Sequence, residues 1–251
     1  DLSEARVAFM VSPGIDYTAV QWGIWKAGGI AVPLCITYPL PSLTYVIEDT
    51  QAEIVFTGPE YEGILKNYVQ EKNLRWYTLE DLGHPIEPSI FPQISIDRGA
   101  MILYTSGTTS LPKGVLTTHA NIESQVSTLI EAWNWTSEDY TLCLLPLHHV
   151  HGIINVMSCA LWAGATVHFL NPFDAKQVFE IMLETGQGAS AIVEEKGLKQ
   201  TNDTGAIEAE IAKTSDTRVA VVRLEQFYPE PIEALNAILG TYPNAEIVWY
   251  Q

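Results

Sequence analysis

Residues 7–34 read VAFMVSPGIDYTAVQWGIWKAGGIAVPL, and the order of apolar runs in this stretch decides the fold class. The runs 7–11 and 30–34 predict two short buried strands. Residues 17–27 predict a helix between them, which stops at a Gly-Gly pair. Strand, helix and strand in this order, with glycine at the joints, are typical of a parallel sheet covered on both faces, so we expect an α/β fold.

The same alternation continues toward the carboxyl terminus. Further strands are expected at 52–56, 100–104, 115–116, 142–145 and 165–169, and further helices at 43–48, 119–133 and 152–162. We therefore expect residues 1–184 to form one domain of parallel sheets flanked by helices.

The composition changes after residue 184. Residues 185–217 contain no aromatic residue and no proline but four glycines, which predicts a linker. Residues 218–251 predict a strand, a helix and a strand. This last segment resembles the carboxy-terminal region of the E1 component of 2-oxoglutarate dehydrogenase, which implies a transketolase-like β-α-β fragment; a generic β-α-β piece is the alternative.

Composition and charge exclude several classes of protein. With 47% hydrophobic and 17% charged residues the chain can bury a large core, which excludes disorder and a coiled coil for the whole chain. Thirty acidic and thirteen basic side chains give a net charge of −17, which argues against nucleic-acid binding. The three cysteines, Cys35, Cys143 and Cys159, form no CxxC pair and are odd in number, which favours a reducing compartment.

Residues 140–173 contain no Asp, Glu, Lys or Arg, so a membrane span has to be considered. Pro146, three histidines and Gly164 would then lie in hydrocarbon, and no basic cluster flanks the run. We expect a buried helix followed by a buried strand instead. Residues 1–6 are mixed in charge and predict neither a signal peptide nor a transit peptide.

The connection between two predicted strands is the most informative segment for function. Residues 104–115 read YTSGTTSLPKGV, with hydroxyl side chains, a glycine for tight turns and Lys113, the only Lys or Arg between residues 99 and 139. Such a loop suits a bound polyphosphate. It is not a Walker A loop, because Pro112 replaces the second glycine and no Ser or Thr follows Lys113. A Ser/Thr-rich surface loop is the alternative.

This segment resembles the phosphate-binding signature of the adenylate-forming enzymes, Tyr-Thr-Ser-Gly-Thr-Thr-Gly-x-Pro-Lys-Gly. Every specified position agrees except the second of the signature's glycines, where Ser110 stands. Residues 21–34, 43–56 and 145–152 are similar to other parts of that family, and residues 133–152 and 161–166 are most like its malonyl-CoA synthetase type. The likeness covers about residues 5–183.

The resemblance implies an ATP-dependent carboxylate–CoA ligase that forms an acyl-adenylate and then a CoA thioester. It implies ATP, Mg²⁺ and CoA, a small carboxylic acid as substrate, and the mitochondrial matrix as location, with the cytoplasm otherwise. His149 would lie by the carboxylate and adenylate, with His151 a weaker candidate. The residues implied to hold the β- and γ-phosphates are Thr105, Ser106, Gly107, Thr108, Thr109 and Lys113.

His148, His149 and His151 have other interpretations. They can be zinc ligands, although adjacent residues on a strand face opposite ways and no Cys or carboxylate stands at a familiar spacing. They can also be structural histidines of the core or a loop. The family likeness favours His149 as the residue that faces a ligand.

Three signatures of the family are not found after residue 184: a Thr-Glu pair for magnesium, a Thr-Gly-Asp for the ribose, and the catalytic lysine. The catalytic residues are therefore unknown, and we expect the chain to be incomplete and inactive as a ligase. The alternative is a catalytically dead remnant that serves as a structural subunit of a mitochondrial assembly. Partner chains are then expected to cover sheet edges and the apolar residues Trp162, Phe227, Tyr228 and Trp249.

Overall fold

The computed structural model describes residues 1–83, 91–105, 111–170, 173–174, 177–178 and 181. Their strands form a six-stranded sheet and a two-stranded sheet. The strands are β1 Arg6–Met10, β2 Ile30–Pro33, β3 Ile54–Thr57, β4 Arg75–Thr78, β5 Gly99–Thr105, β6 Lys113–Thr118, β7 Tyr140–Cys143 and β8 Thr166–Phe169. The α-helices are α1 Ile15–Lys26, α2 Leu40–Asp49, α3 Glu62–Glu71, α4 His119–Trp133 and α5 Cys159–Ala163.

The larger sheet has the order β4-β3-β1-β2-β5-β6. β1 to β5 are parallel, as the sequence predicts, and Val7 of β1 lies opposite Ala31 of β2 and Ile54 of β3. β6 differs: it is longer than the predicted strand at 115–116, and it pairs antiparallel with β5. The reason is the short connection, because a few residues can join antiparallel strands whereas parallel strands need a long crossover.

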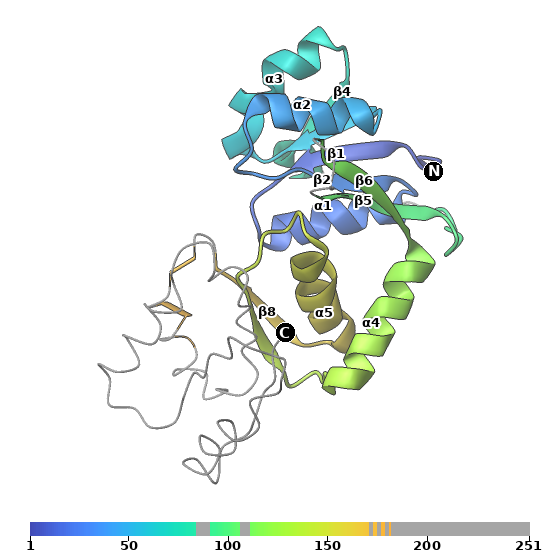
Figure 1. Cartoon of the computed structure of the whole chain (residues 1–251), viewed down its shortest axis with the longest axis vertical. Helices are drawn as coiled ribbons and strands as arrows, with labels where there is room; N and C mark the ends of the chain where they lie inside the picture. Colours follow the sequence, from blue (N-terminus) through green and yellow to red (C-terminus); the bar gives the residue numbers. More distant parts are fainter. Residues whose placement is uncertain (84–90, 106–110, 171–172, 175–176, 179–180, 182–251) are drawn as a thin grey trace.

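Helices cover both faces of this sheet (Figure 1). On one face, α2 and α3 bury Leu43, Ile47 and Leu65 against Val32 and Val55 of the strands. On the other face lies α1, whose residues Tyr17, Val20 and Ile24 share a core cluster with Val7 and Phe9 of β1. The α/β fold with a mostly parallel sheet is therefore confirmed.

The smaller unit packs against α1 through the same core cluster. It contains β7, β8, α5 and a π-helix, η3 (His151–Ser158), and Ile153, Ile154 and Met157 of η3 are fully buried. The sequence predicts one α-helix at 152–162, but its first part is a π-helix, a rare form that is frequently found at functional sites. No helix of the described residues is long and apolar enough to span a membrane.

Other sequence expectations differ from the structure or lie outside it. The strand expected at 142–145 begins earlier and ends at Cys143. The apolar patterns do not predict α3 or β4, because β4 alternates exposed and half-buried residues and α3 buries only Leu65 and Val69. The predicted linker at 185–217 and the β-α-β unit at 218–251 lie outside the described residues.

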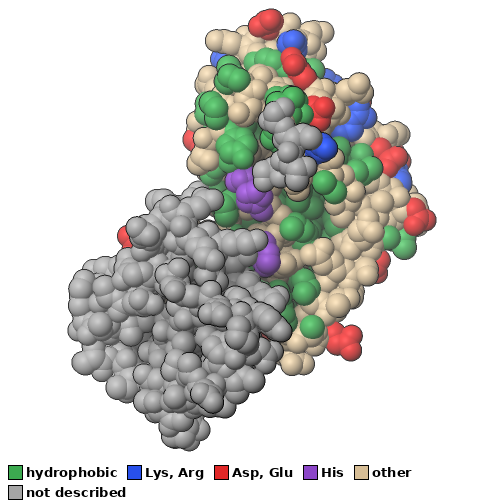
Figure 2. Space-filling model, in the orientation of Figure 1, with side chains coloured by type: hydrophobic (Ala, Val, Ile, Leu, Met, Phe, Trp, Pro, Cys, Tyr) green, Lys and Arg blue, Asp and Glu red, His purple; other side chains and the backbone are tan. Residues whose placement is uncertain are grey.

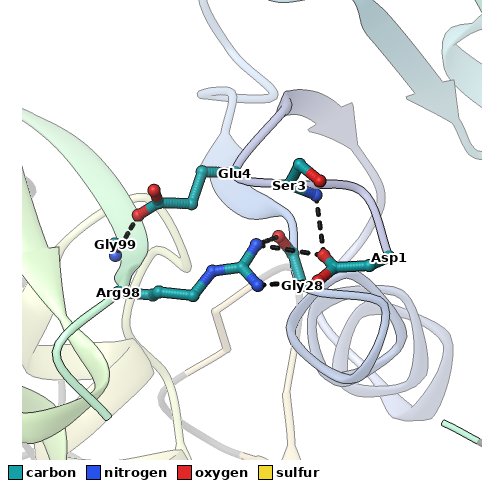
Figure 3. Close-up of polar contacts among 6 residues, drawn as sticks. All are labelled: Asp1, Ser3, Glu4, Gly28, Arg98 and Gly99. Atoms are coloured by element: carbon teal, nitrogen blue, oxygen red, sulfur yellow. Dashed lines mark hydrogen bonds and ion pairs between the residues drawn. The ribbon is translucent and has the colours of Figure 1, made fainter. Parts of the chain in front are cut away.

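A cluster of polar contacts holds the amino-terminal segment to the start of β5 (Figure 3). The Arg98 guanidinium donates to both carboxylate oxygens of Asp1, at 2.9 and 3.1 Å, and to the Gly28 carbonyl oxygen at 2.7 Å. The backbone N–H of Gly99 donates to Glu4 Oε1 at 2.7 Å. These contacts lie beside the amino ends of β1 and β5, so they tie the amino-terminal segment to that end of the larger sheet.

Candidate functional site

The segment predicted to bind phosphate joins β5 to β6. β5 ends at Thr105 and β6 begins at Lys113, and the two residues lie directly opposite each other in the antiparallel register. Both are exposed, and opposed residues project from the same face of a sheet. The hairpin thus brings a hydroxyl and an ammonium group together at the ends of one connection. The other predicted phosphate-binding residues, Ser106, Gly107, Thr108 and Thr109, lie outside the described residues.

Gly114 lets the two strands of this hairpin pack closely. It lies opposite Tyr104, and a Cβ atom at Gly114 would stand 3.2 Å from the Tyr104 ring and 3.0 Å from Ile102 Cγ2. A larger residue would push the Tyr104 ring away from the strand. The glycine after Lys113 therefore has a packing role in addition to any role in binding.

A cavity of about 180 Å³ lies where the carboxyl ends of four strands converge. Val11, Leu34, Leu144 and Leu170 all line it, and each is the residue directly after a strand, namely β1, β2, β7 and β8. Ligands of open α/β sheets bind outside the carboxyl ends of the strands. This cavity is therefore a candidate binding site for an organic ligand.

Among the described residues that line the cavity there is no Asp, Glu, Lys or Arg. Its polar groups are the side chains of Tyr17, Thr37, Cys143 and His148. The remaining lining residues are Pro13, Ile36, Leu145, Pro146, Leu147 and Phe173. An apolar wall with a few convergent polar groups is the usual composition of a small-molecule pocket.

Burial keeps the titratable groups of the wall neutral. It raises the pKa of the Cys143 thiol to about 12 and that of the Tyr17 hydroxyl well above its usual value. Burial, with a smaller contribution from the neighbouring His149, lowers the pKa of His148 to about 4. At neutral pH the described lining residues therefore offer hydroxyl, thiol and neutral imidazole groups, and none of them is charged.

The three histidines lie in a turn and at the start of η3 rather than on a strand. The rings of His148 and His149 are 4.1 Å apart, and His148 also lies 5.9 Å from the Tyr38 ring. The expectation that adjacent histidines here face opposite ways is therefore wrong, because β7 ends at Cys143 and the chain turns before His148. His148 lines the cavity; the lining residues include neither His149 nor His151.

The turn that carries His148 is held from two sides. The Tyr17 hydroxyl of α1 donates a 2.7 Å hydrogen bond to the Leu147 carbonyl oxygen. Gly152 lets η3 approach the turn, since a Cβ there would stand 3.0 Å from the Pro146 carbonyl oxygen and 3.1 Å from Leu145 Cβ. In Figure 2, histidine side chains appear on one face of the molecule with hydrophobic side chains beside them.

Sequence reasoning did not single out Tyr17, Thr37 or His148 as cavity residues. From the sequence, Tyr17 is only the first residue of a predicted helix, and its hydroxyl bonds to a carbonyl 130 positions away. A usable signal was present, because the residues that directly follow buried strands in a parallel sheet meet at one edge. Among the described residues, no group of three or more His, Cys, Asp or Glu side chains is arranged to hold a metal ion.

An open α/β sheet with a cavity at the carboxyl ends of its strands is typical of proteins that bind nucleotides or other small molecules. Residues 3–235 match the family described as AMP-binding enzyme, and the chain belongs to that family.

Its relatives include mitochondrial malonate–CoA ligases. The chain is 41% identical to that of Bos taurus over 191 residues, which are 74% of this chain and 33% of the relative. The human enzyme gives the same identity and coverage. A solved structure of ATP-bound MatB from Rhodopseudomonas palustris is similar with a TM-score of 0.66 and 28% identity, over 72% of this chain and 38% of that one. The chain thus spans about a third of the length of these curated relatives.

Proposed function

We propose that this chain provides the nucleotide-binding part of an ATP-dependent carboxylate–CoA ligase. In the reaction, a carboxylate oxygen attacks the α-phosphorus of ATP, the bond to the β-phosphate oxygen breaks, and pyrophosphate leaves. The CoA thiolate then attacks the acyl carbon and displaces AMP. The observation that supports the proposal is the hairpin that sets Thr105 opposite Lys113, in a chain that belongs to the AMP-binding enzyme family.

In this proposal the hairpin binds the β- and γ-phosphates. Lys113 supplies the positive charge, and Thr105 supplies a hydroxyl from the same face of the sheet. Fixed donors of this kind stabilise the negative charge that develops on departing pyrophosphate. Ser106, Gly107, Thr108 and Thr109 complete the proposed phosphate-binding set.

The carboxylic acid substrate is proposed to be small, and malonate is the specific candidate because the relatives named above are malonate–CoA ligases. A cavity of about 180 Å³ suits an acid of a few carbons. The described lining residues include no Lys or Arg that could pair with the second carboxylate of malonate, so that carboxylate is proposed to be bound by residues other than these. His149, with His151 as the weaker candidate, is proposed to lie by the reacting carboxylate and the adenylate.

The family also implies Mg²⁺, but the described residues do not fit it. They hold no group of three or more carboxylate, His or Cys side chains that could bind a metal ion. No step is therefore assigned to magnesium on these residues. CoA is proposed as the second substrate, and the mitochondrial matrix as the location, because the relatives are named mitochondrial enzymes.

Calorimetric titration of the purified 251-residue chain with ATP tests the proposal. Saturable binding that competes with AMP supports it, and the absence of any ATP binding overturns it.

A second proposal is a structural role beside partner chains. It is favoured by exposed apolar residues in the described part of the chain, namely Val115 and Leu116 of the edge strand β6 and Trp162, which is 61% exposed. Size-exclusion chromatography with light scattering tests it: aggregation relieved by co-expression with a partner supports this role, and a soluble, cooperatively unfolding monomer opposes it.

A further inference from the structure

Helix α2 makes hydrogen bonds to both ends of the connection between β5 and β6. The Tyr45 hydroxyl donates to the Pro112 carbonyl oxygen at 2.9 Å. One turn later on the helix, Asp49 accepts a 2.5 Å hydrogen bond from the Tyr104 hydroxyl. Pro112 and Tyr104 directly precede Lys113 and Thr105, the two described residues of the proposed phosphate site.

The two contacts form one structural unit. Tyr45 and Asp49 are four positions apart, so they share a face of α2. The rings of Tyr45 and Tyr104 also meet edge to face, with their centroids 6.0 Å apart. One helix face therefore contacts the hairpin at both of its ends.

The helix that makes these contacts is itself fixed by the core. Leu43, Val46 and Ile47 of α2 are buried in the core cluster that contains Val32 and Val55 of the larger sheet, and Tyr45 packs against the same cluster. Burial, followed by the hydrogen bond to Asp49, raises the pKa of Tyr104, so its hydroxyl stays protonated and donates at neutral pH. Helix α2, which is fixed by the core, thus holds the β5–β6 hairpin, whose strand β6 lies at the edge of the larger sheet.

We propose that Tyr45 and Asp49 are positioning residues for the triphosphate of ATP. By holding Pro112 and Tyr104, they keep Lys113 and Thr105 in the arrangement that meets the β- and γ-phosphates. Neither residue touches the nucleotide in this proposal. Small displacements of positioned groups weaken binding and catalysis strongly, and pre-organised groups avoid the entropy cost of being ordered on binding. The inference rests on the proposed function, because it presupposes that the hairpin binds ATP.

Nucleotide titrations of the 251-residue chain test the inference with a matched pair of variants. Tyr45→Phe removes only the hydroxyl that holds Pro112. Tyr68→Phe is the control. The Tyr68 hydroxyl also bonds to α2, since it donates to Glu48 Oε1 at 3.3 Å, but this hydrogen bond does not involve the hairpin. ATP and AMP are titrated separately, since AMP lacks the phosphates that the hairpin is proposed to hold.

We expect Tyr45→Phe to weaken ATP binding about 5-fold, the scale of one neutral hydrogen bond, and to leave AMP binding unchanged. Tyr104→Phe should act in the same direction, and Tyr68→Phe should change neither affinity. A loss confined to ATP separates positioning from a general loss of structure, which would weaken both nucleotides. Equal affinities for ATP in Tyr45→Phe and wild type, or equal losses for ATP and AMP, overturn the inference.

The same titrations separate the inference from the proposed function. If the wild type binds no ATP, the proposed function fails and the positioning role fails with it. If the wild type binds ATP and Tyr45→Phe binds it equally well, only the positioning role fails. Hydrogen exchange of the ligand-free chain adds a direct test: amides of β6 should exchange faster in Tyr45→Phe than in Tyr68→Phe, and equal rates contradict the restraint by α2.

Discussion

The Tyr17 hydroxyl donates a 2.7 Å hydrogen bond to the carbonyl oxygen of Leu147, and this bond joins α1 to the turn that carries His148. Tyr17 is 2% exposed and its ring also packs on Phe9 of β1. One side chain therefore contacts the larger sheet, the cavity and the smaller unit. The position of the cavity wall depends on this contact between residues 130 positions apart.

Tyr17→Phe should lower the free energy of unfolding by about 1–2 kcal/mol, because the Leu147 carbonyl loses its partner in a buried environment. Urea unfolding followed by tryptophan fluorescence measures the change. Tyr77→Phe is the control, since the Tyr77 side chain is 45% exposed and its hydroxyl should contribute little. Equal unfolding midpoints for Tyr17→Phe and wild type would contradict the role of this bond.

Lys113→Ala should weaken ATP binding by about 2 kcal/mol, the scale of a charge-assisted hydrogen bond, because Lys113 is the only Lys or Arg between residues 99 and 139. Calorimetric titration with ATP measures the loss, and Lys66→Ala on α3 controls for a change of net charge alone. If Lys113→Ala and wild type bind ATP equally well, the hairpin is not a phosphate site. Ser110→Gly, which restores the family signature, should bind ATP at least as tightly as wild type.

His148 should make stability depend on pH. Its folded-state pKa is lowered from 6.5 to about 4 by burial and by His149, so below pH 6.5 the unfolded chain binds a proton that the folded chain does not. Its contribution is thus complete above pH 6.5 and is lost as the pH falls toward 4. We expect His148→Gln to reduce this loss by about 2 kcal/mol, allowing for the partial exposure of the ring. Urea unfolding across this range measures it; parallel curves for variant and wild type would contradict the assignment.

Two glycines near the end of α1 should respond in opposite directions to alanine. Gly28 has φ of +77°, and a Cβ there would stand 2.4 Å from Asp1 Oδ1 in the cluster of Figure 3. Gly28→Ala should therefore lower the free energy of unfolding by about 1–2 kcal/mol or more. Gly23 lies inside the helix with open space around it, so Gly23→Ala should raise that free energy by up to about 1 kcal/mol. Thermal unfolding of the two variants measures both changes. Equal destabilisation by Gly28→Ala and Gly23→Ala would contradict the prediction.

The purified 251-residue chain should form no acyl-CoA from malonate or acetate with ATP and CoA. The described residues contain no ligand set for magnesium, and the sequence after residue 184 lacks the family's ribose-binding carboxylate and lysine signatures. Without these groups the hairpin has nothing to orient the attacking carboxylate against the α-phosphate. Chromatographic detection of the CoA thioester measures the outcome, and sustained turnover would show that this expectation is wrong.

Local patterns in the sequence were sufficient to predict the fold class and to recognise the loop signature. The strand, helix, strand order in residues 7–34 predicted the parallel sheet, because burial on both faces leaves continuous apolar runs that end at glycine or proline. The signature at 104–114 predicted the family, since its residue types are adjacent in the chain and need no tertiary contact to be recognised. The phosphate-binding role of that signature and the ligand-facing role of His149 and His151 remain predictions.

Only the tertiary structure decided which residues share the cavity and which support the hairpin. Tyr17 meets Leu147, and Tyr45 meets Pro112, across 130 and 67 positions of sequence. Neither pair follows a helical or strand period, because each contact depends on how separate elements pack. The same holds for His148, which lines the cavity because β7 ends at Cys143 and the chain then turns, so that the His148 ring lies 5.9 Å from the Tyr38 ring.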